Sequence, residues 1–176
     1  MSEPPSERRR PGRTAVLAVA ALPLLAGAAL AYRLLSSAPD ATAAMARGRY
    51  AEAARHYGVA AEAGDPAAMT ALGNLHYLGL GTVRNARRAA ELYFEAARLG
   101  HADAQLNLGN LYSQGLGVPA DPLRAFGWYA TADRYGQPAA EYYLSQISLE
   151  YTLSPLQQST AAERWRTLEL LVAEGL

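Results

Sequence analysis

The sequence predicts an all-α fold, a short right-handed α/α solenoid of about three helical hairpins preceded by one N-terminal transmembrane helix. Three observations support this prediction. The chain is 51% hydrophobic and rich in Ala, Leu, Arg and Glu, with two Trp and two Phe, a composition typical of helices and not of sheets. An uncharged run occupies residues 15–32, and a 36-residue periodicity occupies most of the remainder.

Charge and cysteine content exclude several classes of protein. The 176 residues include 16 basic and 16 acidic side chains and no cysteine. Zero net charge argues against a general nucleic-acid binder. The absence of cysteine excludes a disulfide-stapled module and a cysteine-ligated metal centre.

The N-terminal region has the features of a targeting segment. Residues 1–13, rich in proline and arginine, predict a disordered cytoplasmic tail. The 18 uncharged residues that follow are just long enough to span a bilayer, which predicts a transmembrane signal-anchor helix over 14–35. Four arginines precede this run and one follows it, so the remainder should face the periplasm of a bacterial cell. Cleavage after Ala31 is the alternative.

A short linker is expected over 36–48 and a repeat domain over 49–176. Gly64, Gly100 and Gly136 recur every 36 residues, as do Tyr57, Tyr93, Tyr129 and Trp165. Such a period indicates stacked helical hairpins, because one hairpin cannot bury its apolar face alone. The first helix of each hairpin (helix A) is expected at 66–79, 102–115 and 138–150, and the second (helix B) at 49–63, 85–99, 121–135 and 160–174.

Helix boundaries follow from local signals. An aspartate before a proline marks two helix starts, Asp65-Pro66 and Asp121-Pro122. Thr160 and Glu163 match a capping box. The three repeated glycines stand just beyond each helix B, where a left-handed residue is needed.

Two segments carry a resemblance to a known family. They are Leu72-Gly73 through Gly79-Leu80-Gly81 to Gly100, and Leu108-Gly109-Asn110-Leu111-Tyr112 through Gly115-Leu116-Gly117 to Gly136. They resemble Sel-one-like repeats, relatives of the tetratricopeptide repeat, and the resemblance extends over about 43–174. It implies an interaction scaffold and does not name the partner.

The sequence offers no catalytic constellation. His56 and His76 are expected to be packed core residues, and His101 is expected to cap a helix start. None of the three has a metal-ligand partner three or four residues later in the chain. Glu91 and Glu95 are expected on a solvated helix face, and Gly79-Leu80-Gly81 lacks the strand and lysine of a phosphate loop. We therefore expect no enzyme, no cofactor and no metal.

Binding is the function that remains. In the tetratricopeptide architecture that the repeats resemble, helix A lines the groove, and neighbouring amides there could pair with an extended peptide. No basic residue stands beside the asparagines, so a neutral peptide segment fits better than a terminal carboxylate. The predicted groove residues are Thr70, Asn74, Tyr77, Leu106, Asn110, Ser113, Gln114, Tyr142 and Gln146.

The predicted function is a membrane-anchored periplasmic interaction scaffold or accessory subunit of an envelope complex. It would bind a membrane or periplasmic protein and neither nucleic acid nor a small-molecule substrate. The alternative is an immunity protein that neutralises a secreted toxic enzyme. The apolar residues of 160–174 fit either capping of the last hairpin or a docking surface.

Overall fold

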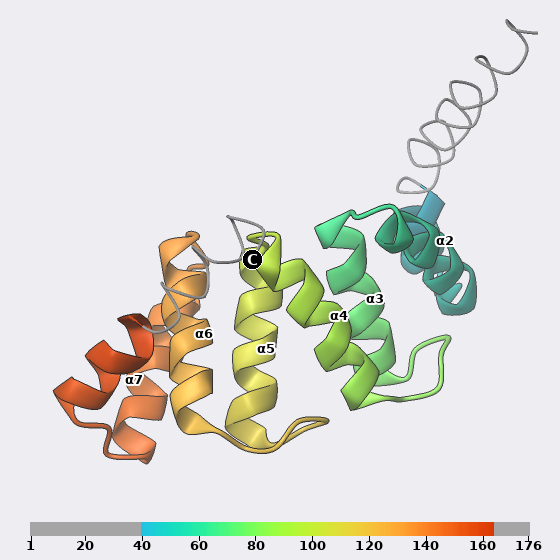
Figure 1. Cartoon of the computed structure of the whole chain (residues 1–176). Coiled ribbons are helices and arrows are strands. Elements are labelled where there is room, and N and C mark those ends of the chain that lie inside the picture. Colours follow the sequence, from blue (N-terminus) through green and yellow to red (C-terminus); the bar gives the residue numbers. More distant parts are fainter. Residues whose placement is uncertain (1–39, 164–176) are drawn as a thin grey trace, which may run out of the picture. The chain divides into compact units, whose positions relative to one another are not determined.

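The computed structural model describes residues 40–163, which are helical with no strand among them. In chain order the principal helices are α2 (Tyr50–Glu62), α3 (Pro66–Leu78), α4 (Ala86–Arg98), α5 (Ala102–Gln114), α6 (Pro122–Arg134) and α7 (Ala140–Glu150) (Figure 1). Helical residues 40–46 precede α2, and helical residues 155–163 follow α7. The all-α solenoid that the sequence predicts is therefore confirmed.

The residues that the structure describes all belong to one compact unit. Between residues 40 and 163, no helix combines the length and the hydropathy needed to cross a membrane. The tail predicted at 1–13, the transmembrane helix predicted at 14–35 and the end of the last helix at 164–174 lie outside the described residues.

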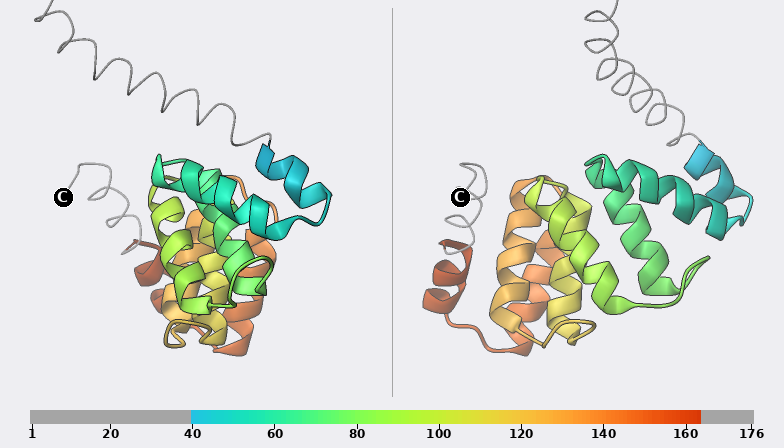
Figure 2. Two further views of the ribbon diagram at one scale, coloured as in Figure 1. Left: turned by 90° about the vertical axis from the view of Figure 1, so that its right-hand side faces the viewer. Right: turned by 45° about the vertical axis from the view of Figure 1, so that its right-hand side comes forward.

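The 36-residue period is reproduced residue by residue. The B helices α2, α4 and α6 begin at Tyr50, Ala86 and Pro122, and each has 13 residues. The A helices α3 and α5 begin at Pro66 and Ala102 and also have 13 residues. Each helix packs against the next, so the hairpins lie side by side in a row (Figure 2).

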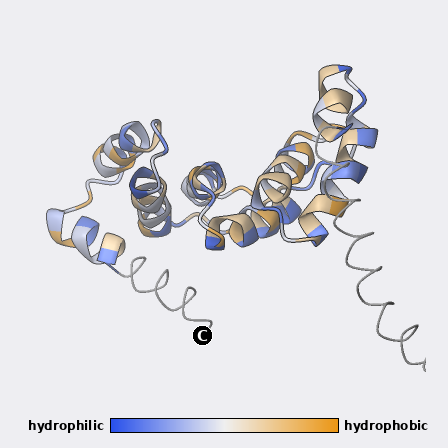
Figure 3. Ribbon diagram, turned by 90° about the horizontal axis from the view of Figure 1, so that it is seen from above, coloured by the Kyte–Doolittle hydropathy of each residue, from blue (hydrophilic) through white to orange (hydrophobic). Residues whose placement is uncertain are grey.

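Small side chains let these helices approach closely. Ala89, Ala96 and Ala104 are fully buried, and they share one cluster with Leu108 and Trp128. Burial of apolar area and dense packing stabilise the stack, since no cysteine is available to cross-link it. Seen from above, hydrophilic and hydrophobic residues alternate along the helices (Figure 3). This is expected where one face of each helix packs against a neighbour and the other is exposed to solvent.

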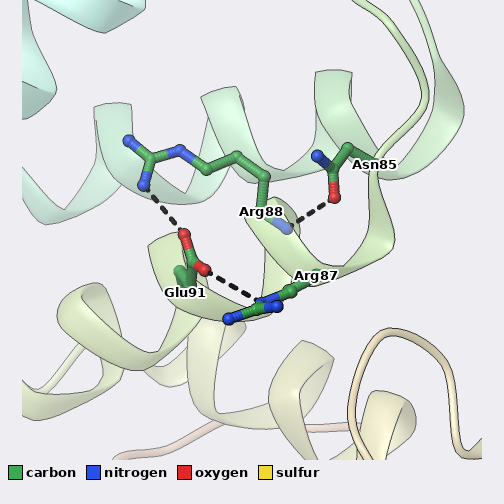
Figure 4. Close-up of polar contacts among 4 residues, drawn as sticks. All are labelled: Asn85, Arg87, Arg88 and Glu91. Carbon is green, nitrogen blue, oxygen red and sulfur yellow. Dashed lines mark hydrogen bonds and ion pairs between the residues drawn. The ribbon is translucent and has the colours of Figure 1, made fainter.

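Polar side chains fix three of the helix starts. Asp65 accepts hydrogen bonds from the N–H groups of Ala67 and Ala68 at 2.9 and 3.3 Å, and Asp121 accepts one from Arg124 at 3.0 Å. Both predicted caps are thus confirmed. A third cap, which was not predicted, is Asn85, whose side chain accepts a hydrogen bond from the Arg88 N–H at 2.9 Å (Figure 4).

The glycine turns after the A helices allow neighbouring hairpins to touch. Gly81 and Gly117 have φ of 67° and 73°, which favours glycine. A Cβ atom on Gly81 would collide with the backbone of Tyr50 and Ala51, and one on Gly117 would collide with the backbone of Ala86 and Arg87. Each turn therefore rests directly on the first residues of the preceding helix B.

Residues 40–46 correct the prediction of a linker over 36–48. They form a helix whose Ala41 and Ala44 are 0% and 3% exposed. Ala44 packs in a cluster with Ala53 and Leu75. An alanine-rich segment favours helix and fits closely against a neighbour, so these residues cover the first hairpin and do not act as a free tether.

The predicted capping box at Thr160 and Glu163 is wrong. The last helix begins at residue 155, and the Thr160 hydroxyl donates to Leu156 O inside it at 2.7 Å. The capping box lies at Ser154 and Gln157. The Gln157 N–H donates to Ser154 Oγ at 3.3 Å, and the Ser154 N–H donates to Gln157 Oε1 at 2.9 Å. Pro155 at the first helical position reinforces this earlier start.

Candidate functional site: a cleft between the A helices

A cleft of about 220 Å³ lies between α3 and α5. It brings together four of the nine predicted groove residues: Asn74 and Tyr77 from α3, and Asn110 and Gln114 from α5. The other lining residues are Leu78, Tyr93, Asn107 and Leu111. None of the eight lining side chains carries a formal charge at neutral pH.

Two buried tyrosines orient the cleft asparagines through hydrogen bonds. The Tyr93 hydroxyl donates to Asn74 Oδ1 at 2.6 Å, and the Tyr129 hydroxyl donates to Asn110 Oδ1 at 2.8 Å. Asn107 Nδ2 also donates to Asn74 Oδ1, at 3.3 Å. Each of the two amide oxygens thus accepts at least one hydrogen bond within the domain, and no bond donated by Asn74 Nδ2 or Asn110 Nδ2 occurs among the described residues, so both Nδ2 groups can donate to a partner.

Burial keeps both tyrosines in the donor form. It raises the pKa of Tyr93 far above its ordinary value of 10, and the neighbouring Tyr77 raises it further. Burial also raises the pKa of Tyr129 to about 12, although a hydrogen bond with Ser113 lowers it. Because the neutral phenol retains its proton, these two hydroxyls remain donors throughout the physiological pH range.

Glycines make room for the tyrosine rings. A Cβ atom on Gly73 would lie 2.6 Å from Tyr93 Cε1, and one on Gly109 would lie 2.5 Å from Tyr129 Cε1. Both distances are much shorter than an ordinary carbon–carbon contact. The absence of a side chain at Gly73 and Gly109 thus leaves space for a tyrosine of the following B helix to reach the neighbouring asparagine.

The remaining predicted groove residues lie elsewhere. Thr70 is 5% exposed, so it offers little surface to a partner. Leu106 is half-buried against the cluster that contains Phe126. Ser113 is half-buried beside Tyr129. Tyr142 is 62% exposed and Gln146 is exposed, both on α7, and neither lines the cleft.

The histidines have structural surroundings. His101 occupies the N-cap position of α5, but its side chain makes no cap hydrogen bond, which corrects that prediction. Its Nδ1 lies 3.1 Å from Thr70 Oγ1. Because the Thr70 hydroxyl donates its one proton to Pro66 O at 2.8 Å, we infer that His101 Nδ1 donates to Thr70.

His56 and His76 are both partly buried. His56 Nε2 lies 4.0 Å from Glu52 Oε1. His76 Nδ1 is buried without a hydrogen-bond partner among the described residues, so His76 is packed but is not hydrogen-bonded at that atom as expected. Across residues 40–163, no group of three or more histidines and carboxylates could hold a metal ion.

Comparison with known proteins defines the repeat. The Sel1 repeat matches residues 66–101 and 102–132, which together contain the whole cleft. Residues 66–132 are Sel1 repeats. Over these residues the match confirms the repeat type expected from the sequence.

Two solved structures with Sel1-type repeats resemble this chain. A protective antigen of uropathogenic Escherichia coli strains that displays an SLR fold has a TM-score of 0.69 and 26% identity, covering 78% of this chain and 30% of the antigen. A Sel1 repeat protein from Oxalobacter formigenes has a TM-score of 0.59 and 31% identity, covering 62% of this chain and 45% of that protein. The chain thus spans less than half the length of either. No curated protein matched it.

The positioning role of Tyr93 and Tyr129 in the cleft was not predicted, because the tyrosine series served only to mark the repeat period. The separation of 19 residues between Asn74 and Tyr93, repeated between Asn110 and Tyr129, was the available signal. Asn107 gave none, because Ala71 and Tyr143 stand at the matching positions of neighbouring units.

Proposed function

We propose that this chain is a membrane-anchored adaptor of the bacterial envelope whose α3–α5 cleft binds an extended segment of a protein partner. The observation that supports this most strongly is the pair of amides, Asn74 and Asn110, held at the same position of successive Sel1 repeats by Tyr93 and Tyr129. Preorganised polar groups lower the entropy that binding costs.

The hydrogen-bonding capacity of the cleft indicates what the partner supplies. The carbonyls of Asn74 and Asn110 already accept from tyrosines. Their N–H groups, together with the Gln114 amide, can donate to backbone carbonyls of an extended segment. The neutral lining and the adjacent Leu78 and Leu111 favour an uncharged, partly apolar segment.

The N-terminal sequence supports membrane anchoring. The uncharged run at residues 15–32 follows four arginines, the pattern of a single-pass segment with its N-terminus in the cytoplasm. Attachment to the inner membrane would raise the effective concentration of the repeat domain near membrane partners. A modest affinity of one cleft then suffices for an accessory subunit.

Capture from solubilised membranes by the tagged full chain tests the cleft. Gln114→Arg places a bulky cation on the exposed part of the lining, where no hydrogen bond is lost. Leu123→Arg is the matched control: it adds the same charge at an exposed position of α6, where α4 has Arg87.

We expect the wild-type chain and Leu123→Arg to retain the same partner, identified by mass spectrometry, and Gln114→Arg to recover at least tenfold less. A tenfold change corresponds to about 1.4 kcal/mol of binding free energy. Equal recovery by all three chains would contradict binding through the cleft.

A further inference from the structure

A second cleft, of about 370 Å³, lies against α2, α3 and α4. Its volume falls within the range of about 300–1,000 Å³ typical of ligand pockets. The lining residues include Gly58 and Glu62 from α2, Met69 and Leu72 from α3, and Leu92, Phe94 and Glu95 from α4. None of its lining residues belongs to the α3–α5 cleft.

The repeat register shows what this cleft lacks. One period later, where α4 meets α6, Phe94 packs edge-on against Trp128 with ring centroids 6.1 Å apart. The Arg98 guanidinium lies over the Phe94 ring at 5.9 Å. The matching positions at the α2–α4 contact are Gly58 for Phe94, Glu62 for Arg98 and Leu92 for Trp128. These three positions therefore carry neither an aromatic ring nor a cation, although Phe94 and Arg88 line the cleft from α4.

The vacant position is open. A Cβ atom on Gly58 would meet no atom within 4 Å. Met69, Leu72 and Leu92 supply apolar lining, and Phe94 at the cleft is 41% exposed. An aromatic ring entering beside Gly58 would gain apolar burial and contact with Phe94.

The cleft lining carries three carboxylates, Glu62, Glu91 and Glu95, and one guanidinium, Arg88, so its net negative charge favours a cationic partner. Glu91 pairs with Arg87 and Arg88 at 3.5 and 3.0 Å (Figure 4), and Glu95 pairs with Arg98 at 3.3 Å. Within residues 40–163, Glu62 has no ion-pair partner. It is also the last residue of α2, where the helix dipole adds partial negative charge.

We propose that this cleft, formed because Gly58 and Glu62 replace an aromatic and an arginine, binds a protein segment that carries an aromatic residue and a basic residue one helical turn apart. The aromatic ring occupies the space beside Gly58, and the basic group pairs with Glu62. This surface is separate from the α3–α5 cleft, so the two sites bind different parts of a partner or two partners at once.

Methionine methyl NMR of the full chain in detergent micelles tests this proposal. The chain has three methionines. Met69 lines the cleft, whereas Met45 packs in another cluster and serves as an internal control. The probe is the capped pentapeptide Phe-Ala-Ala-Ala-Arg, compared with Ala-Ala-Ala-Ala-Arg and Phe-Ala-Ala-Ala-Glu.

We expect the Phe-Arg peptide to change the chemical shift of the Met69 methyl group, with saturation at about millimolar concentration, the affinity expected of a small ligand. The chemical shift of the Met45 methyl group should not change. Each comparison peptide should bind at least fivefold more weakly. Gly58→Phe fills the space and should abolish the response, whereas Gly58→Ala adds one methyl group and should retain it. Glu62→Gln should weaken the Phe-Arg peptide at least threefold and leave the Phe-Glu peptide no weaker.

Equal shifts with Phe-Arg and Ala-Arg, no Met69 shift with any peptide, or an unchanged response in Gly58→Phe would each overturn the proposal. These outcomes are independent of the α3–α5 cleft, because Gln114→Arg leaves the probe site intact. The Gln114→Arg chain should therefore bind the Phe-Arg peptide as the wild type does.

Discussion

At the residue scale, a glycine, an asparagine and a tyrosine act together in each Sel1 repeat of this chain. Gly109 makes room for the Tyr129 ring, and the Tyr129 hydroxyl holds Asn110. Burial of the tyrosine therefore stabilises the hairpin and orients the cleft amide at once. The same three roles recur at Gly73, Tyr93 and Asn74.

Gly109→Ala tests this arrangement. Its Cβ would lie 2.5 Å from Tyr129 Cε1, so the ring must move and weaken its bond to Asn110. Overpacking costs about 1–3 kcal/mol, which should exceed the gain of about 1 kcal/mol in helix propensity. We expect a lower free energy of unfolding by urea denaturation followed by circular dichroism.

Gly58→Ala is the matched control, because it lies inside a helix with open space around its Cβ. There the propensity gain of about 1 kcal/mol acts alone, and the free energy of unfolding should rise. Stabilisation by both substitutions would show that the Gly109–Tyr129 contact is looser than described. Gly109→Leu should prevent folding.

The glycine, the asparagine and the tyrosine and their 36-residue spacing could be read from the sequence. The contact between the glycine and the tyrosine ring, and the hydrogen bond from the tyrosine to the asparagine, could not. Periodicity shows which positions have the same environment in successive repeats. A hydrogen bond between two residues 19 positions apart on different helices also depends on how those helices cross. The asparagines were expected to offer both amide N–H and C=O to a peptide. The tyrosines occupy part of the acceptor capacity of these two C=O groups, so the asparagines offer more donor than acceptor capacity to a partner.

At the element scale, local signals predicted helix existence well, and starts were accurate where proline or aspartate fixed them. Predicted starts lie within two residues of those observed for α2 to α7. The last helix is the exception, because Ser154 and Gln157 cap it six residues before Thr160. The sequence there contains two successive capping-box patterns, at 154–157 and 160–163, and Pro155 favours the earlier one.

Ser154→Ala and Thr160→Ala separate the two possible starts. Loss of the Ser154 acceptor should lower the free energy of unfolding by about 1 kcal/mol. Thr160 lies inside the helix, where alanine has the higher propensity, so Thr160→Ala should be neutral or slightly stabilising. Thermal denaturation of both chains measures the difference, and a larger loss for Thr160→Ala would place the cap where the sequence first suggested.

At the scale of the whole molecule, the repeat domain keeps one 36-residue spacing. The second cleft lies where the residues of one unit differ from those at the matching positions of the next. Gly58 and Glu62 keep the 36-residue spacing while differing in chemistry from Phe94 and Arg98. A partner surface therefore arises where a unit at the edge of the array lacks the side chains that fill an internal one. Periodicity finds the matching positions, but only the packed structure shows which of them leave space.

Topology is a prediction for the whole chain. Because four arginines precede the uncharged run and one follows it, the repeat domain should be exported. Alkaline phosphatase fused after Leu176 should be active in a Gram-negative host, and the same enzyme fused after Arg13 should be inactive. A silent fusion at Leu176 alongside a fluorescent cytoplasmic reporter at that site would contradict the topology.

The most direct measurement of the central claim is site-specific photocrosslinking in living cells from the α3–α5 cleft. A photoreactive residue at Gln114 should form one discrete protein adduct, because this position lines the cleft beside Asn110. The same residue at Leu123, exposed on α6, should form none of that adduct. Equal adducts from both positions, or adducts only from Leu123, would contradict the account that the cleft between the A helices binds the partner.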